Sequence, residues 1–362
     1  MNAKIKQVNS DNNITNNSYK ITTKFMLKIV LLFSCSILGV GFISGSEIYE
    51  FFVRFKMFLP LGCIIFFALI FILTKKIFIQ NNNYQNMLKM QNFDKNISNN
   101  TFLNKFNIKR FLLFLNCFAV SAAMFSGLQV LAKKLFFDNY FIPIILCLTL
   151  VFVVLLIGIK GLDKLDYFVL IFLIFIIANF SINLCFGDSK IDLNYIFDLS
   201  DFSTLGLVGS IFFASNYVFM NIIQVQPILA EFNVKFSKKQ INIISGIFAA
   251  ALSFVLILFS LFLIANMRYS NYSMPFLEYF SHKGGALYFI YVIGLVLALI
   301  SSLMGCLFGV KKEIKPFVKK NFWASALAIV LPFVFGFVDF KFFVTIVYPI
   351  VGVINFVIFL FL

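Results

Sequence analysis

Glycine and carboxylate residues meet in the stretch LGVGFISGSEIYEFF, which covers residues 38–52. It follows an apolar run, FMLKIVLLFSCSI at residues 25–37, that is typical of a helix in lipid. Glycine loosens a helix because it adopts backbone angles that other residues avoid. An ionised carboxylate within a span costs about 2.5–3.5 kcal/mol on insertion scales, so it is usually buried against a partner or a cavity. The stretch therefore predicts a binding site inside the membrane.

Unwinding this helix would free backbone groups around Gly39, Gly41 and Gly45. Irregular backbone survives in lipid only where it lines a cavity or contacts a ligand. The half-helix after a break presents its partially positive amino end to an anion, and the half-helix before it presents carbonyl oxygens to a cation. Both ends together suit a zwitterionic amino acid with a co-transported Na⁺. The alternative is that Gly41 and Gly45 are a small-xxx-small pair that lets two helices pack closely.

Two glutamates, Glu47 and Glu50, follow the glycines one helical turn apart and therefore share a face. Glu47 is nearer to the break, so we expect it to accept a coupling proton or to pair with a basic residue as an outer gate. An interfacial salt bridge to the neighbouring Arg54 or Lys56 is the simpler alternative. For Glu50 the simpler interpretation is the favoured one.

The composition indicates the class of protein. Hydrophobic residues make up 61% of the 362 residues, 12% are charged, and the mean hydropathy is +0.96. A soluble domain could not bury this much apolar surface, whereas helices in a bilayer expose it to lipid. We therefore expect an all-α, polytopic membrane protein. Its net charge of +15 does not indicate a nucleic-acid partner, because the lysines cluster between apolar runs.

Polar breaks divide the chain into ten candidate spans. They cover residues 25–54, 57–79, 108–132, 140–159, 164–186, 203–230, 239–266, 284–309, 321–337 and 342–362. If the amino terminus is cytoplasmic, the inside segments hold 22 of the 30 basic residues, so we expect both termini inside. Residues 1–23 are then a disordered cytoplasmic tail, and residues 24–362 form the transmembrane domain.

Ten spans give two halves of five, at residues 24–187 and 202–362. An odd number of spans per half reverses the orientation of the second half, which is the condition for an inverted repeat. Transporters of that design interrupt the first helix of each half, so spans 1 and 6 should both be broken. The predicted substrate-binding residues lie at these two places: Gly39, Gly41, Phe42, Ser44, Gly45, Ala214, Ser215, Asn216 and Tyr217. The alternative for the polar residues of span 6 is hydrogen bonding across helices.

The first stretch also resembles a known family. GVGFISGSEIYEFF is similar to the first-helix signature of the YkvI-like bacterial membrane proteins, roughly G-A-G-F-A-S-G-Q-E followed by an aromatic pair. SNYVFMNI, MPFLEYF and YPIVGVINF later in the chain resemble the same family, whereas Val40, Ile43 and Ser46 depart from its signature. The family resembles the amino acid–polyamine–organocation superfamily. The resemblance implies a LeuT-type fold in the bacterial inner membrane.

The resemblance also implies a sodium site. In LeuT-type sodium symporters the first helix supplies carbonyl oxygens, and the eighth supplies a carbonyl followed three and four residues later by two hydroxyls. Span 8 reads ALISSLMG, which has this spacing. The implied ligands are Cys35, Leu38, Ala298, Ser301 and Ser302. Serine pairs that bond within their own helix, or pack at a small interface, are the alternative.

The function that these observations predict is secondary active transport of a small, amino-acid-like solute, coupled to Na⁺ or H⁺. The alternative is a membrane sensor or assembly protein that retains the transporter fold, with the Asn-rich segment at 80–107 as a docking loop. An enzyme is not expected, because the chain has no HExxH, no GxSxG and no paired aspartates at one depth. No cofactor is expected besides the possible Na⁺.

Overall fold

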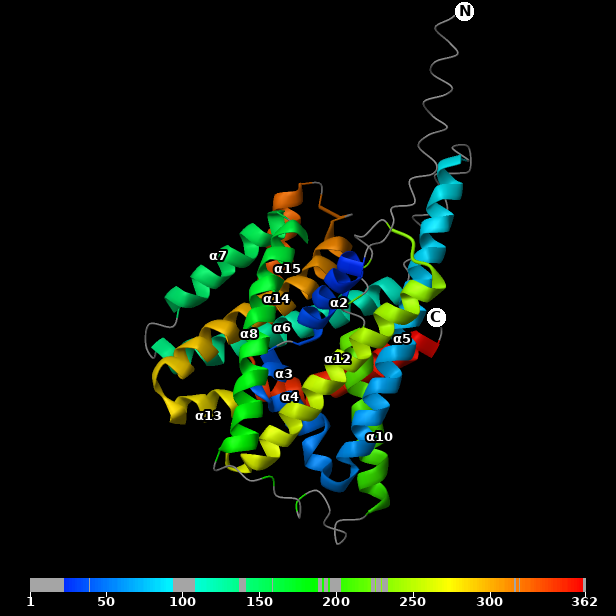
Figure 1. Cartoon of the computed structure of the whole chain (residues 1–362). Helices are drawn as coiled ribbons and strands as arrows, with labels where there is room; N and C mark the ends of the chain where they lie inside the picture. The colour runs from blue at the N-terminus through cyan, green and yellow to red at the C-terminus, as the bar shows by residue number, and fades with distance from the viewer. Residues whose placement is uncertain are drawn as a thin grey trace, which may run out of the picture.

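The computed structural model describes residues 23–38, 40–93, 108–136, 141–157, 159–187, 203–222, 234–315 and 320–360, with single residues between them. Throughout these ranges the regular elements are helices, packed as one bundle (Figure 1). Seven of the helices are long and apolar enough to cross a membrane, and two shorter apolar helices accompany them. The expectation of an all-α, polytopic membrane protein is therefore confirmed at this level.

The helices follow the chain in a simple order. They are α2 (Thr23–Ile37), α3 (Val40–Ser44), α4 (Ser46–Phe51), η1 (Val53–Phe58), α5 (Leu59–Phe93), α6 (Ile108–Phe136), α7 (Phe141–Ile157), α8 (Ile159–Phe186), α10 (Thr204–Ile222), α12 (Lys238–Ala265), η4 (Met267–Tyr269), α13 (Pro275–Lys283), α14 (Gly285–Ile314), α15 (Asn321–Phe335), α16 (Phe340–Phe342), the π-helical turn η5 (Phe343–Val347) and α17 (Tyr348–Leu360). Most of these bounds lie within a few residues of the expected spans. Charged and amide-rich breaks thus mark the helix ends well.

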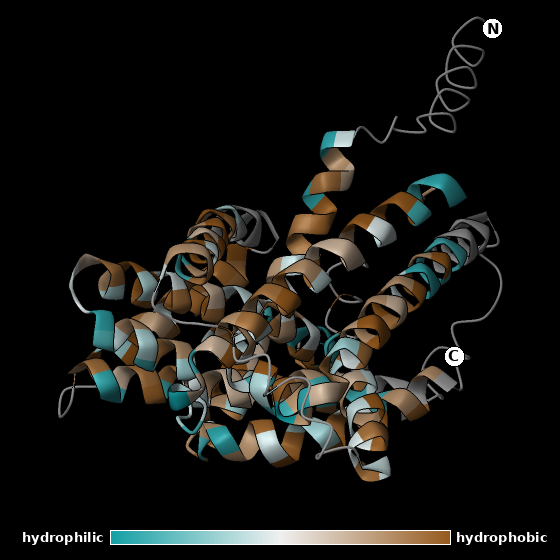
Figure 2. Cartoon of the chain, turned by 60° about the horizontal axis from the view of Figure 1, so that its bottom comes forward, coloured by the Kyte–Doolittle hydropathy of each residue, from teal (hydrophilic) through white to brown (hydrophobic). Residues whose placement is uncertain are grey.

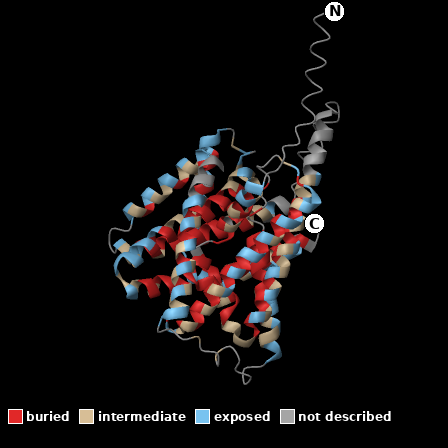
Figure 3. Ribbon diagram, viewed as in Figure 1, coloured by how far each residue is buried: buried red, intermediate tan, exposed pale blue. Residues whose placement is uncertain are grey.

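Apolar side chains cover the outside of the bundle as well as its centre. Figure 2 shows hydrophobic residues along most helices and hydrophilic residues gathered near helix ends. Phe186 and Leu205, for example, are 87% and 83% exposed. The buried residues lie in the middle of the bundle (Figure 3). An apolar rim around a packed core is stable in lipid, which solvates the rim, and would be unstable in water.

Helix α5 is longer than the sequence predicted. It runs for 35 residues to Phe93 and reaches beyond the rest of the bundle at the top of Figure 1. At about 1.5 Å per residue this exceeds the roughly 30 Å of hydrocarbon. The prediction of a loop from residue 80 is therefore wrong over residues 80–93. No glycine or proline follows Cys63 before Ile108, so nothing in the sequence stops the helix at the membrane surface.

Two lysine side chains each bind the carboxyl-terminal end of a neighbouring helix. The Lys76 Nζ donates to the carbonyl of Phe359 at 2.9 Å, and the Lys311 Nζ donates to the carbonyl of Leu155 at 2.9 Å. Each ammonium thus binds an unpaired carbonyl in the last turn of a neighbouring helix, where the helix dipole favours a cation. The carboxyl-terminal end of α17 therefore lies beside the middle of α5, and that of α7 lies beside the last turns of α14.

Candidate functional site

The first span is interrupted, as its glycines predict. Helix α2 ends at Ile37, α3 covers Val40–Ser44, and α4 begins at Ser46. Gly45 separates α3 from α4 with a φ of +87°, a left-handed conformation that glycine adopts without strain. Gly39 falls between α2 and α3, outside the described residues. The chain therefore changes direction at two closely spaced points inside the core.

Hydroxyl groups satisfy the carbonyls that these breaks expose. The Gly41 carbonyl accepts hydrogen bonds from Ser44 Oγ at 3.1 Å and from Ser46 Oγ at 3.5 Å. The Ile43 carbonyl accepts one from Tyr291 Oη of α14 at 2.9 Å. Buried carbonyl groups need such partners, so short hydroxyl side chains make the irregular backbone tolerable here.

An aromatic side chain from α13 covers the second break. A Cβ added to Gly45 would lie 3.1 Å from ring atoms of Phe276, so that ring rests directly on the glycine. Phe276 also packs against Phe180 and Phe259, with ring centroids 4.8 and 5.6 Å apart. The break is therefore closed on this side by a tightly packed aromatic layer.

Glu47 is buried beside the break and bonded to α10. Its side chain is 2% exposed, and its Oε2 accepts a hydrogen bond from Tyr217 Oη at 2.8 Å. A methyl group on Gly41 would collide with the Glu47 carboxylate, so the carboxylate lies against the glycine backbone. In the part of the chain that the structure describes, no basic side chain forms an ion pair with Glu47. The hypothesis of a salt bridge from Glu47 to Arg54 or Lys56 is therefore wrong.

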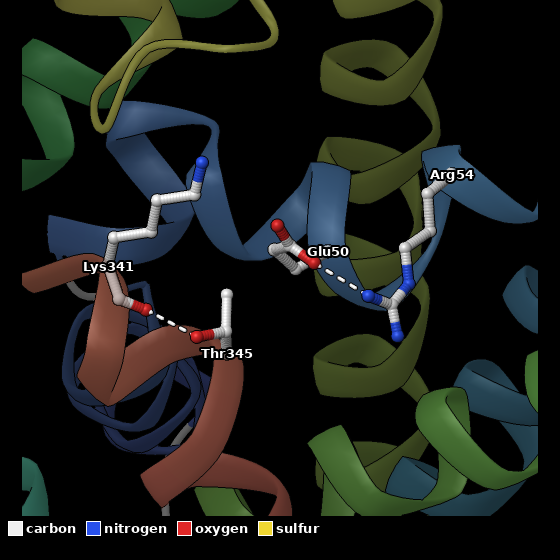
Figure 4. Close-up of polar contacts among 4 residues, drawn as sticks. All are labelled: Glu50, Arg54, Lys341 and Thr345. Carbon is white, nitrogen blue, oxygen red and sulfur yellow. Dashed lines mark hydrogen bonds and ion pairs between the residues drawn. The ribbon is translucent and has the colours of Figure 1, made fainter.

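Arg54 pairs with the other glutamate instead. Its Nη1 lies 2.7 Å from Glu50 Oε2 across one turn, which confirms the simpler interpretation of Glu50 (Figure 4). A small pocket of about 10 Å³ lies between Glu50, Ser46 and Lys341, with room for about one water molecule. The two glutamates thus differ in surroundings, because Glu50 faces a charged, partly open rim and Glu47 faces the core.

The predicted interruption of the sixth span at Ala214–Tyr217 is wrong. Helix α10 runs unbroken from Thr204 to Ile222, and Val225 and Leu229 beyond it are helical too. The polar side chains bond across helices instead of marking an unwound segment. Asn216 Nδ2 donates to the Pro349 carbonyl of α17 at 2.8 Å, which was the alternative for these residues. Because these polar side chains find hydrogen-bond partners on neighbouring helices, the backbone of α10 can stay helical.

Only some of the predicted substrate-binding residues lie in contact with one another. The Phe42 ring centroid lies 6.3 Å from that of Tyr217, so the first span and α10 do touch at these positions. Ala214 and Ser44 are also fully buried, whereas Ser215 is only partly buried. The cluster that forms consists of Gly41, Phe42, Glu47 and Tyr217.

The implied sodium ligands come from two helices that are in contact. Ser302 Oγ donates a hydrogen bond to the Cys35 carbonyl at 3.2 Å, which joins α14 to α2. Ala298 and Ser301 of α14 and Leu38, the residue after α2, are also buried. The Ser302 and Cys35 oxygens are close enough to bind one cation if the hydroxyl hydrogen turns away. Neutral, hard oxygen ligands suit a monovalent ion.

Several residues of the site were not predicted from the sequence. Phe276 belongs to the segment MPFLEYF, for which the sequence predicts a family resemblance but no role. Tyr291 gave no signal, because one aromatic residue in a helix with few polar side chains is ordinary. The Glu47–Tyr217 pair joins residues 170 positions apart, and no local pattern reports such a contact.

Comparison of the chain with protein-family models, with curated proteins and with solved structures found no match.

Proposed function

We propose that this protein is a secondary active transporter of a small, amino-acid-like solute, coupled to Na⁺ or H⁺ and working by alternating access. The observation that carries the proposal is the buried Glu47 beside the broken first span, bonded to Tyr217 of α10. A buried carboxylate without a cationic partner is costly, and so is irregular backbone at membrane depth. Both costs are offset where an exchangeable cation binds the carboxylate and a solute binds the free backbone groups.

The packing of the helices supports an inverted repeat. Pairing α2–α4 with α10, α5 with α12, α6 with α14, α7 with α15 and α8 with α17 exchanges the two halves of the chain. Under this exchange the α5–α10 packing corresponds to α12–α2, α8–α14 to α17–α6, α7–α14 to α15–α6, and α2–α8 to α10–α17, and all eight are helix pairs in contact. The α5–α12 and α6–α14 pairs map onto themselves. Such matched packing favours two related halves in opposite orientations, at 24–187 and 202–362.

The Glu47–Tyr217 bond links the two halves at the proposed site. Neutralising Glu47 with a proton or a cation weakens its attraction for the Tyr217 hydroxyl, because hydrogen bonds to charged groups are the stronger ones. The halves then rock more easily against each other. Occupation by the driving ion would in this way shift the equilibrium between outward-open and inward-open states. Solute binding between Gly41, Phe42 and Tyr217 would shift the same equilibrium further.

A thermal-shift screen of the purified protein tests the proposal. Amino acids are added in Na⁺ or K⁺ at several pH values, and the melting temperature is followed. A solute at 100 times its Kd stabilises the folded state by about 2.7 kcal/mol. We expect one class of solute to raise the melting temperature only with Na⁺, or only at low pH. If no amino acid, amine or nucleobase does so under any ion condition, the transporter proposal fails.

The variant Ser302→Ala distinguishes Na⁺ coupling from proton coupling. If Na⁺ binds between Cys35 and Ser302, the variant loses the Na⁺-dependent stabilisation. Ser325→Ala is the matched control, since Ser325 is equally buried but bonds to the Asn321 carbonyl of its own helix at 3.0 Å. An unchanged Na⁺ effect in Ser302→Ala removes the sodium site and leaves proton coupling.

The second candidate function, a sensor or assembly protein, draws on one observation. Helix α5 extends past the bundle, and such an extension would offer a partner a surface outside the membrane (Figure 1). This function predicts a stable complex on pull-down and no dependence on ion gradients. Loss of this complex when residues 84–93 are deleted, together with a thermal-shift screen in which no solute raises the melting temperature, would favour the sensor or assembly function.

A further inference from the structure

A second group of buried polar side chains lies where α6, α10 and α17 meet. Asn116, Asn216, Tyr348 and Asn355 are each at most 4% exposed. Asn355 Nδ2 donates to Asn116 Oδ1 at 2.7 Å and to the Phe219 carbonyl at 3.2 Å. We call these four side chains the polar seam. Its hydrogen bonds tie three helices together inside an otherwise apolar core.

The polar seam has unused hydrogen-bonding capacity. Within the described residues, Tyr348 Oη, Asn216 Oδ1, Asn355 Oδ1 and Asn116 Nδ2 have no hydrogen-bond partner. A buried polar atom without a partner costs about 1–3 kcal/mol, and native proteins usually supply one, from the protein or from water. Donors and acceptors are both present on three adjacent helices, as water molecules with two to four partners require. The seam is therefore suited to hold internal water.

The polar groups of the seam follow one face of α17. Tyr348, Gly352 and Asn355 are spaced by four and three residues, so they share one face of α17 over about 10 Å. Gly352 keeps this face open to polar groups, since a Cβ there would collide with Asn216 Oδ1. The face therefore presents polar groups along the helix axis, with a glycine where a larger side chain would block them.

The two ends of the seam reach charged groups. Tyr348 begins α17 directly after η5, and η5 packs against α4, the helix that carries Glu47, so this end of the seam adjoins the candidate site. Asn116 lies near the start of α6, and α6 packs against α14. Glu313 lies in the last turns of α14, beside Lys311 and Lys312. The seam thus extends from the neighbourhood of the buried carboxylate to α6, which packs against the lysine-bearing helix α14.

We propose that the polar seam holds a file of water molecules that carries protons between Glu47 and the lysine-rich end of α14. A proton from bulk water enters at that end, each water passes one on, and the Glu47 carboxylate becomes a carboxyl group. No electron is transferred, and the proton leaves by reversing the same steps. The titratable groups facing Glu47 are Tyr217 and Tyr348, and no described base competes for the proton. The inference rests on the proposed function in one respect, that Glu47 is the coupling group.

Radiolytic footprinting tests for the water directly. Hydroxyl radicals made from bound water oxidise the side chains beside it even when those side chains are buried. Tyr348 and Tyr291 are both 0% exposed, but Tyr291 Oη is bonded to the Ile43 carbonyl and Tyr348 Oη is unpaired. We expect oxidation of Tyr348 and little of Tyr291. Equal protection of both tyrosines means a dry seam and overturns the proposal.

A pH-jump experiment tests the proton path. The infrared carboxyl signal of Glu47, identified by its loss in Glu47→Gln, is followed after rapid mixing. Tyr348→Phe removes an oxygen that has no protein partner, so the fold loses no bond, and we expect protonation to slow by about tenfold or more. Asn355→Leu should act alike. Asn179→Leu is the control, because Asn179 Oδ1 is also unpaired but lies on α8.

The outcomes separate this inference from the proposed function. A Glu47 signal that never titrates, or Tyr348→Phe and Asn355→Leu with wild-type rates, overturns the proton path. Neither measurement uses a solute. Solute binding in the thermal-shift screen can therefore succeed while the water file fails, and the reverse can also happen.

Discussion

At the scale of single residues, the site depends on how Glu47 tolerates burial. The structure offers its carboxylate one side-chain donor, Tyr217 Oη, and the backbone surface of Gly41. A hydrogen bond to a charged group contributes about 1.5–3 kcal/mol, which is less than the cost of burying an ionised carboxylate without a cation. Binding of a proton or cation at Glu47 is therefore favourable, and the strength of the Tyr217–Glu47 hydrogen bond changes when one binds.

Tyr217→Phe removes this donor and keeps the ring. We expect the free energy of unfolding to fall by about 1–3 kcal/mol where Glu47 is ionised, and by less where a proton or cation neutralises it. Chemical denaturation in detergent at several pH values measures the difference. Tyr291→Phe is the control, because its hydroxyl bonds to a neutral carbonyl at 2.9 Å and should give a loss that does not change with pH.

A double-mutant cycle with Glu47→Gln isolates the pair. The two residues are in contact, so their effects should not add, with a coupling energy of about 0.5–3 kcal/mol. Additive effects would mean that the hydrogen bond contributes nothing to stability.

At the scale of elements, the first span is shaped by what each glycine permits. Gly45 needs a left-handed backbone and gives its surface to the Phe276 ring, whereas the described glycines in the interiors of the long helices have no positive φ. The break therefore depends on one residue type at one position. Glycine content alone does not identify that position, because Gly41 lies inside α3 with helical neighbours.

Gly45→Ala tests this dependence. The alanine would be strained at a φ of +87° and would press on Phe276 at 3.1 Å, so we expect a loss of about 1–3 kcal/mol in unfolding free energy. Gly246→Ala is the matched control on α12, where the nearest atom to the new Cβ is 4.0 Å away. It should stabilise the protein by about 0.4–1 kcal/mol. Equal effects of the two variants would contradict the assigned backbone of the break.

Some elements follow from local sequence features, and others depend on contacts with distant residues. Helix ends and the first break follow from local features, namely apolar runs, amide-rich breaks and the Gly45 backbone, so they were predictable. The continuity of α10 at Ala214–Tyr217 was not, because a polar residue in a span looks the same whether it marks a break or bonds to another helix. Only the position of Pro349 on α17 decides between these cases. The length of α5 was missed because its stop signal is absent.

At the scale of the whole molecule, charge predicts orientation. Lys76 and Lys311 each cap the carboxyl-terminal end of a neighbouring helix, and Lys283 of α13 lies just before the start of α14. Basic residues collect on the cytoplasmic side of membrane proteins. The end with Lys76 and Lys311 should therefore face the cytoplasm, with both termini on that side.

Cysteine accessibility measures this orientation. Lys283→Cys and Lys238→Cys are each made in a background where the exposed Cys185 is serine, and intact cells are treated with a membrane-impermeant maleimide. Both lysines are exposed; Lys238 begins α12, and Lys283 ends α13 just before α14. The expected topology places these two positions on opposite sides of the membrane. We expect Lys283→Cys to react at once and Lys238→Cys to react only after permeabilisation. The opposite pattern would reverse the assigned topology.

The most direct test of the transporter account is uptake into proteoliposomes under an imposed Na⁺ or pH gradient. The solute is the one that stabilises the protein best in the thermal-shift screen. We expect the wild-type protein to accumulate it only while a gradient drives it. Glu47→Gln should reduce driven uptake by at least about tenfold, the effect of about 1.4 kcal/mol, and Glu50→Gln, which loses only the rim ion pair with Arg54, should remain active. Uptake that ignores both gradients, or equal accumulation by Glu47→Gln and the wild type, would contradict the account.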